Sequence, residues 1–292
     1  MELEALLKKM VAIPSISKNE QNLSTFLREY MMDNGVRSEM CGDNVICSVG
    51  SGKKTLLFNS HLDTVPACSG WKTDPFKPVK KDGRIIGLGA NDAKASMTAM
   101  ADAVIRLADS KTLDGRLFFA ATVQEETLNV GIQQVMERLG KVDAVVIGEP
   151  TGLDICTSMR GLVILRLKST GRSAHASRPS EGVNAIYRTM SDIERLKRIK
   201  FPKKHPVLGC PSIATTMING GVKSNVIPSE CEFTVDVRTT PFYGNMDIIE
   251  IIKRSVESKV DVVSSRLIPK ETGSGEKIVR AAKKANPGGR GE

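Results

Sequence analysis

Strand-like apolar runs alternate with helical patterns through the first half of this 292-residue chain. Strands are predicted for the runs NVICSV, TLLFNS, GRLFFAATV and DAVVIG, at residues 44–49, 55–60, 115–123 and 143–148. Residues 93–109 place Met97, Ala101 and Val104 on one helical face. Two more helices precede the first strand, one closed by Pro14 and one ending at Asn34-Gly35. This alternation is typical of an α/β domain with a largely parallel central sheet.

From about residue 160 the order of predicted elements changes. Strands are expected at 160–171, 211–220, 231–240 and 260–269, and helices at 181–199 and 245–258. The resulting β-α-β-β-α-β order is the split arrangement of ferredoxin-like α+β units. We therefore expect residues 158–271 to form an inserted domain, with residues 1–157 and 272–292 forming the other. A short helix over 275–285 and a loop-like tail, NPGGRGE, end the chain.

Composition restricts the classes of function. The 42 basic residues exceed the 33 acidic ones, but the lysines form scattered doublets and aromatic residues make up only 4% of the chain. This pattern favours a solvated surface over nucleic-acid binding. The six cysteines form no C-x-x-C pair, the N-terminus lacks a signal-peptide layout, and no apolar run approaches ~18 residues. We expect a cytoplasmic protein with no nucleic-acid or membrane partner.

Polar residues follow the predicted strands at the edge where an open α/β sheet binds ligands, beyond the carboxyl ends of its strands. One imidazole and five carboxylates fall there: His61, Asp63, Asp92, Glu125, Glu126 and Glu149. Five negative charges in one place would repel one another unless some keep protons or cations lie between them. Imidazole and carboxylate ligands suit zinc, with cobalt and manganese as alternatives.

Each of these residues also has an ordinary structural interpretation. Asp92 precedes a helix and could cap it, Glu125-Glu126 could be a solvated strand end, Glu149 could open a turn before Pro150, and His61 could be a structural histidine. Their joint occurrence after successive strands favours the metal site. The Gly-x-Gly of GLGAND does not indicate dinucleotide binding, because Asp92 holds the third glycine position and would repel a pyrophosphate.

Motifs along the whole chain carry a family resemblance. In order they are SHLDTVP, GLGANDAKAS, QEET, GEPT, GRSAHASRP, KSNVIP and VDVRTTP. Together they resemble the zinc aminoacylase and deacylase family of metallopeptidases. The stretches GWKTDPFKPV, GLGANDAKAS and HPVLG are most similar to its acetylornithine deacetylase branch. The resemblance implies a two-domain metallohydrolase that removes acetyl from N-acetyl-L-ornithine in arginine biosynthesis.

The resemblance also implies roles for the residues at the sheet edge. His61 and Glu149 would bind one Zn2+, Asp92 would bridge to a second Zn2+, and Glu126 would bind that second ion. Asp63 would orient the His61 ring. Glu125 would be the general base, taking a proton from the attacking water and passing it to the departing amine. Co2+ is an alternative metal.

Further roles fall in the inserted domain. The resemblance implies that His175 reaches the active site of the other subunit in a homodimer formed through this domain. Asn225 and Arg238 would contact the substrate carboxylate, for which a guanidinium offers a bidentate grip. His205 is expected to be structural or solvated.

Members of this family continue beyond the point that corresponds to Glu292. That continuation carries a last histidine ligand, and the chain has only three histidines. The second metal site is therefore expected to be incomplete, with weak or absent activity and a tendency to aggregate. Two alternatives stay open. One is another N-acyl amino acid as substrate, such as acetylcitrulline, acetyl-lysine or succinyl-diaminopimelate, and the other is a non-catalytic truncated paralogue.

Overall fold

A computed structural model describes residues 2–108, 110 and 113–286. The chain forms two compact units, Met1–Gly152 and Leu153–Glu292. Residues 272–286 belong to the second unit, whereas the sequence patterns assign 272–292 to the first domain; that domain assignment stays a prediction. Of the predicted NPGGRGE tail, residues 287–292 lie outside the described residues. Within the described part of the chain, no helix combines the length and apolar character needed to cross a bilayer.

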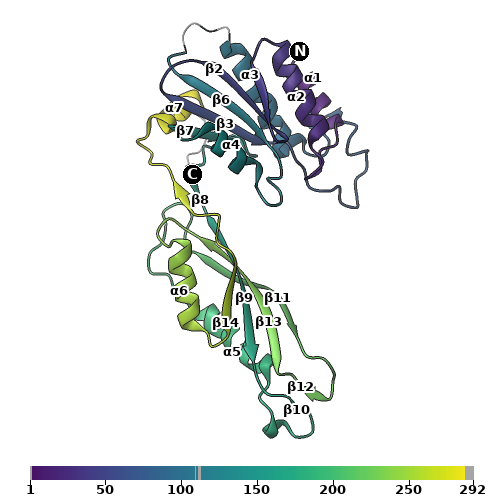
Figure 1. Ribbon diagram of the computed structural model, residues 1–292, viewed down its shortest axis with the longest axis vertical. Coiled ribbons are helices and arrows are strands. Elements are labelled where there is room, and N and C mark those ends of the chain that lie inside the picture. The colour runs from purple at the N-terminus through teal and green to yellow at the C-terminus, as the bar shows by residue number, and fades with distance from the viewer. Residues whose placement is uncertain (1, 109, 111–112, 287–292) are drawn as a thin grey trace. The chain divides into compact units, whose positions relative to one another are not determined.

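The first unit contains a five-stranded sheet in the order β1-β2-β6-β3-β7 (Figure 1). Its strands are β1 (Ser38–Cys41), β2 (Asn44–Gly50), β3 (Thr55–His61), β6 (Arg116–Thr122) and β7 (Ala144–Ile147). Its helices are α1 (Leu3–Ala12), α2 (Gln21–Asp33), α3 (Ala95–Ala108) and α4 (Gly131–Leu139), with the irregular turn η1 (Ala90–Lys94) before α3. A small hairpin pairs β4 (Val79–Lys81) with β5 (Arg84–Ile86).

Strand direction in this sheet is mixed but mostly parallel. β3 pairs in parallel with both β6 and β7, whereas β2 runs antiparallel to β6 and to β1. Because β1 reverses β2, which itself reverses β6, four of the five strands point the same way. The predicted α/β class with a largely parallel sheet is confirmed. The carboxyl ends of β3, β6 and β7 consequently share one edge.

Alternating side chains of the strands build two cores, one on each face of the sheet. Val45, Cys47 and Val49 of β2 pack into the core that also contains buried residues of α1, α2 and α3. Ile46, between them in sequence, packs on the opposite face with Val135 of α4. The period of two in a strand sends neighbouring residues to opposite faces, so both faces of this sheet are covered by helices.

The second unit contains the predicted split β-α-β-β-α-β motif. Its strands β9 (Gly161–Thr170), β11 (Ser212–Gly220), β13 (Glu230–Thr239) and β14 (Lys259–Ser264) form an antiparallel sheet in the order β11-β13-β9-β14. The two crossing helices are α5 (Ala185–Arg198) and α6 (Asn245–Ser255). Asn184 begins α5 by accepting a hydrogen bond from the Ile186 N–H on its side-chain oxygen. The predicted fold class is therefore confirmed in this unit as well.

Short elements complete the second unit. They are β8 (Ser158–Met159) paired with β15 (Lys270–Glu271), β10 (Ala174–His175) paired with β12 (Val226–Ile227), the 3-10 turn η2 (Pro179–Glu181) and α7 (Lys277–Ala285). The core lies between one sheet face and α5 and α6, where Leu165, Val235 and Ile249 are buried. β11 is an edge strand, and its residues are mostly exposed.

Candidate metal centre

The carboxyl edge of the parallel strands gathers residues that are far apart in sequence. β3 ends at His61, which pairs in register with Thr122, the last residue of β6. Glu125 and Glu126 follow Thr122 closely, and Glu149 follows the end of β7 at Ile147. Parallel strands in register bring their following loops to the same edge, so the topology accounts for this grouping.

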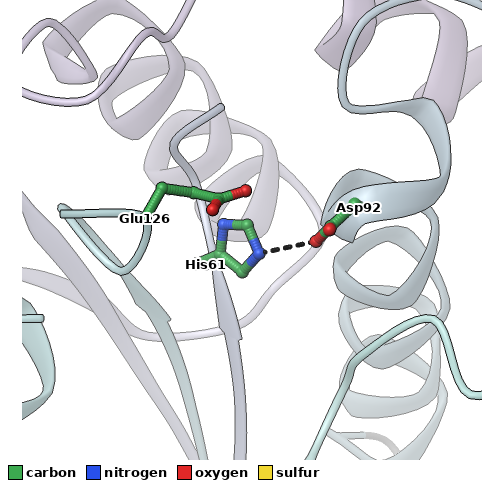
Figure 2. A group of neighbouring side chains, drawn as sticks. All are labelled: His61, Asp92 and Glu126. Carbon is green, nitrogen blue, oxygen red and sulfur yellow. Dashed lines mark hydrogen bonds and ion pairs between the residues drawn. The ribbon is translucent and has the colours of Figure 1, made fainter. Parts of the chain in front are cut away.

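His61, Asp92 and Glu126 form one group that could hold a metal ion (Figure 2). One ligand atom from each residue lies within 4.8 Å of the other two. The Nε2 atom of His61 is 3.0 Å from Oδ1 of Asp92 and 3.9 Å from Oε2 of Glu149. The imidazole side chain is only 2% exposed, whereas the Asp92 side chain is 52% exposed. The buried ring therefore faces a cluster of carboxylates that opens to solvent.

Asp92 does not act as the helix cap that its position before α3 suggested. It lies inside η1, where its backbone is non-helical, and its carboxylate contacts His61 instead. Gly89 precedes this turn with a φ of 73°, and a side chain there would come within 2.5 Å of Thr64 Cγ2. The second glycine of GLGAND thus permits the close approach of η1 to the end of β3.

The other nitrogen of His61 is held by the residue two places later. Nδ1 lies 2.9 Å from the backbone carbonyl oxygen of Asp63 and 3.5 Å from its carboxylate Oδ1. A carbonyl only accepts hydrogen bonds, so Nδ1 donates and Nε2 faces Asp92. The closest partner of the ring within Asp63 is therefore the main-chain oxygen.

The carboxylate of Asp63 organises the opposite side of the site. It is fully buried and accepts hydrogen bonds from Ser17 Oγ at 2.7 Å, from the Glu125 N–H at 3.0 Å and from the Glu126 N–H at 3.1 Å. Burial raises its pKa, but these hydrogen bonds and His61 outweigh burial and leave the pKa below its ordinary value. Asp63 is thus an ionised anchor for the loop that carries both glutamates.

The site holds more negative charge than its protein partners neutralise. Burial raises the pKa of Glu125 and Glu126, and nearby carboxylates add to the effect. Burial and the same carboxylates raise the pKa of Glu149 to about 7, although His61 opposes them. Burial lowers the pKa of His61, but Asp63, Glu149 and Asp92 outweigh it and raise the value to about 10. One imidazole among several mutually repelling carboxylates fits a divalent cation, which would relieve both effects.

Two contributors to this site carried no clear signal in the sequence. Ser17 donates to Asp63, and Lys94, which is completely buried, donates to the carbonyl oxygens of Met10 and Ile13 at 3.0 and 3.1 Å. Burial lowers the pKa of Lys94 to about 8. Lys94 ties η1 to the end of α1. Its position two residues after Asp92 in the GLGANDAKAS motif was the only available hint.

The remaining predicted site residues lie in the second unit at two separate places. His175 and Asn225 are neighbours in the β10-β12 ribbon, where the Ala176 N–H donates to the Asn225 carbonyl. Asn225 precedes the start of β13 at Glu230, whereas Arg238 lies near the carboxyl end of that strand. Arg238 is eight residues beyond Glu230 and therefore roughly 26 Å along the strand. Its guanidinium holds Asp236 through two hydrogen bonds of 2.9 and 3.2 Å. Within one chain this unit does not bring Asn225 and Arg238 together.

His205 is structural. It is fully buried, its Nδ1 accepts hydrogen bonds from the N–H groups of Val207 and Leu208, and its Nε2 lies 3.3 Å from Glu271. The solvated alternative is wrong, because the 205–209 loop folds around the ring.

Comparison with known proteins gives a family for this arrangement. Residues 57–284 match the model of peptidase family M20/M25/M40. The chain is similar to acetylornithine deacetylases, with 33% identity to that of Proteus mirabilis over 73% of this chain and 57% of the relative. Identity is 30% to that of Edwardsiella ictaluri, over 90% of this chain and 74% of the relative. The chain thus spans between about half and three quarters of the length of these curated relatives.

Solved structures show the same fold. Aminopeptidase PepT from Bacillus cereus superposes with a TM-score of 0.81 at 22% identity, covering 99% of this chain and 83% of that one. The YXEP protein of Bacillus subtilis, described as a dinuclear metal-binding peptidase, gives a TM-score of 0.73 at 17% identity over 99% and 80% of the two chains. The resemblance that the motifs predicted is confirmed. On this combined sequence and fold similarity, the chain belongs to peptidase family M20/M25/M40.

Proposed function

We propose that this chain is a metal-dependent amidohydrolase that removes acetyl from N-acetyl-L-ornithine, producing ornithine and acetate for arginine biosynthesis. The observation that carries the proposal is the grouping of His61, Asp92 and Glu126 within 4.8 Å at the carboxyl edge of the sheet. Similarity to acetylornithine deacetylases at 30–33% identity supports the choice of substrate. The six cysteines form no C-x-x-C pair, which fits a reducing cytoplasm.

Four residues would hold the metal. His61 and Glu149 would hold one Zn2+, and Asp92 and Glu126 would hold a second. Cobalt is the alternative. A bound divalent ion supplies Lewis-acid polarisation of the substrate carbonyl and lowers the pKa of a water in the site. The chemistry of the donor set, an imidazole with several carboxylates, supports zinc over magnesium or calcium.

Glu125 is proposed as the group that moves the proton. It takes a proton from water as the water oxygen forms a bond to the amide carbonyl carbon. It then gives that proton to the amide nitrogen as the carbon–nitrogen bond breaks. Burial raises the pKa of Glu125, which brings it closer to the range in which a carboxylate both accepts and returns a proton near neutral pH. Asp63 positions Glu125 by accepting its backbone N–H.

A homodimer through the second unit explains why the expected substrate contacts are split. His175 and Asn225 lie roughly 26 Å or more along the sheet from Arg238, too far for one amino-acid-sized substrate. We infer that Arg238 grips the substrate carboxylate in one chain, while His175 and Asn225 serve the site of the other chain. Exposed apolar residues on the edge strand β11 and on α5 support a dimer. Met217 and Ile218 lie on β11 and Tyr187 and Met190 on α5, and each is more than half exposed.

The test is a substrate panel with the purified chain and added Zn2+ or Co2+. N-acetyl-L-ornithine, acetylcitrulline, acetyl-lysine and succinyl-diaminopimelate are assayed for release of the acyl group. The proposal expects acetate from acetylornithine with the highest kcat/KM of the panel, and loss of the activity in Glu125→Gln. A higher kcat/KM on another member would assign the substrate to that alternative.

A non-catalytic role is the second candidate from the sequence. It predicts dimers that form with no bound metal, so metal content per chain separates the two. About one or two equivalents of zinc retained after gel filtration supports the enzyme. Absence of retained or titratable metal would refute it.

A further inference from the structure

Four successive backbone N–H groups after strand β6 all donate to side-chain oxygens. Val123 donates to Asn44 Oδ1 at 3.0 Å and Gln124 donates to Glu20 Oε1 at 3.0 Å. The N–H groups of Glu125 and Glu126 donate to the two carboxylate oxygens of Asp63. Asn44, Glu20 and Asp63 are all at most 1% exposed. We call residues 123–126 the glutamate loop, since it ends in the proposed base and the proposed ligand.

This loop needs such partners because it leaves the sheet. β6 ends at Thr122, so among the described residues no neighbouring strand pairs with the N–H groups that follow. Gln124 has a left-handed backbone with a φ of 57°, which a residue other than glycine adopts only when its surroundings hold it. The turn sets the directions in which the side chains of Glu125 and Glu126 leave the backbone.

Glu20 is the least expected of the three partners. It stands at the N-cap position of α2, yet its side chain makes no capping hydrogen bond there and reaches a backbone N–H 104 positions later in the sequence. Burial raises the pKa of its carboxyl, while the N–H groups of Lys18, Gln124 and Glu20 itself oppose this. The negative charge of Asp63 raises the pKa of Glu20 further. A helix cap would need neither the burial nor the long reach.

The connection between α1 and α2 holds the rest of the site as well. Ser15 Oγ donates to the Leu62 carbonyl, and Ser17 Oγ donates to Asp63. Glu20 therefore belongs to a segment, residues 15–20, that contacts both the end of β3 and the glutamate loop. The segment touches the loops that carry the ligands rather than the ligand atoms themselves.

We propose that Glu20 is a positioning residue for the metal and proton-transfer chemistry of this site. It fixes the left-handed turn at Gln124 and thereby keeps Glu126 directed at the metal and Glu125 directed at the water. The inference rests on the proposed function, and it assigns to Glu20 no contact with substrate or metal. Its effect should appear in kcat and in metal coordination, with little change in KM.

Three variants test this positioning role. Glu20→Gln keeps an oxygen that can accept the Gln124 N–H, Glu20→Asp withdraws the carboxylate by one methylene, and Glu20→Ala removes it. Asp143→Ala is the matched control. Asp143 also accepts a backbone N–H, that of Thr55, at the start of β3 roughly 20 Å from His61 along the strand.

The measurements are kcat and KM on the best panel substrate, the visible absorption of the Co2+-loaded chain, Co2+ affinity by calorimetry, and urea unfolding. Glu20→Ala and Glu20→Asp are expected to lower kcat at least about tenfold, since a misplacement of about 1 Å can cost about 100-fold. KM should stay within about threefold. The Co2+ spectrum should change and the affinity fall. Glu20→Gln should keep kcat within about threefold of the parent chain.

The control separates positioning from general destabilisation. Asp143→Ala should weaken urea resistance yet leave kcat and the Co2+ spectrum unchanged. If Glu20→Ala does not fold, Glu20→Asp carries the test. Parent-like kcat and Co2+ spectrum in Glu20→Asp would overturn the proposal, as would a loss in Glu20→Gln equal to that in Glu20→Asp. A parent chain that binds Co2+ but hydrolyses no substrate refutes the proposed function alone, because the Co2+ spectra of the Glu20 variants still test the positioning role. A parent chain that binds no Co2+ overturns both.

Discussion

Neutralising one carboxylate of the metal centre should stabilise the metal-free protein while weakening the metal-loaded one. Glu149→Gln is the most informative such change, because it keeps the size of the side chain and removes one negative charge. In the native chain, burial and the charges of Glu125, Asp92 and Glu126 raise the pKa of Glu149 despite the opposing effect of His61. The ionised form is therefore penalised in the folded state.

The size of the penalty follows from the pKa. A rise from 4.5 to about 7 corresponds to roughly 3 kcal/mol, at about 1.4 kcal/mol for each pH unit. The Glu149 side chain is 37% exposed, so solvent screening reduces the expected gain to roughly 1–2 kcal/mol. The penalty is absent below pH 4.5, grows as the pH rises to about 7, and is constant above that. Glu149→Gln should consequently gain stability at pH 8 and none at pH 4.5.

Trp71 makes the measurement specific to the first unit, because it is the only tryptophan in the chain. Urea unfolding is followed by its fluorescence, in EDTA and then with excess Zn2+. In EDTA at pH 8 the variant should be the more stable. With Zn2+ at about 100 times Kd the native chain gains roughly 2.7 kcal/mol and the order should reverse. The control Glu29→Gln, an exposed acid on α2, should change stability by less than about 0.5 kcal/mol. A destabilised Glu149→Gln in EDTA at pH 8 would refute the idea that these carboxylates repel one another.

Three further predictions concern the anchor, the protons and the dimer. Asp63→Asn should lower the free energy of unfolding by about 3 kcal/mol, because an amide nitrogen would then face one of the N–H groups that donate hydrogen bonds to the carboxylate. A loss below about 1 kcal/mol in urea unfolding would contradict this prediction. Metal affinity should rise about tenfold per pH unit between pH 7 and 8, because His61, with its pKa raised to about 10, must release a proton to bind the metal. Calorimetry in two buffers of different ionisation enthalpy should detect that proton. A pH-independent affinity would contradict the assignment of His61 as a ligand. Met217→Lys, on the exposed edge strand β11, should shift a dimer to monomers in analytical ultracentrifugation, whereas Lys253→Met on α6 should not; an unchanged dimer would place the interface elsewhere.

The sequence predicted the main strands and helices of both units because their signals are local, but it did not predict β1 or α4. Short apolar runs mark β2 and β9, and helical spacing marks α3 and α5, whatever the rest of the chain does. The grouping of the candidate ligands could also be predicted from the sequence. It needed only the rule that the carboxyl ends of parallel strands meet at one edge.

Partner choice at the site was decided by the tertiary structure. Asp63 was predicted to orient the His61 ring. The ring lies closer to the carbonyl oxygen of Asp63 than to its carboxylate, and the carboxylate accepts the N–H groups of Glu125 and Glu126. No sequence pattern links Glu20 with Gln124, because a hydrogen bond across 104 positions exists only once several loops have packed together. Separation of Asn225 from Arg238 likewise follows from their places along one sheet.

Periodicity and residue type therefore determined which segments become strands and helices, and which residue types could bind a cation. Only the folded chain decided which buried oxygen each backbone N–H meets. The reason is physical: a secondary-structure preference is set within a few residues, whereas the partner of a buried polar group depends on every element that excludes water around it.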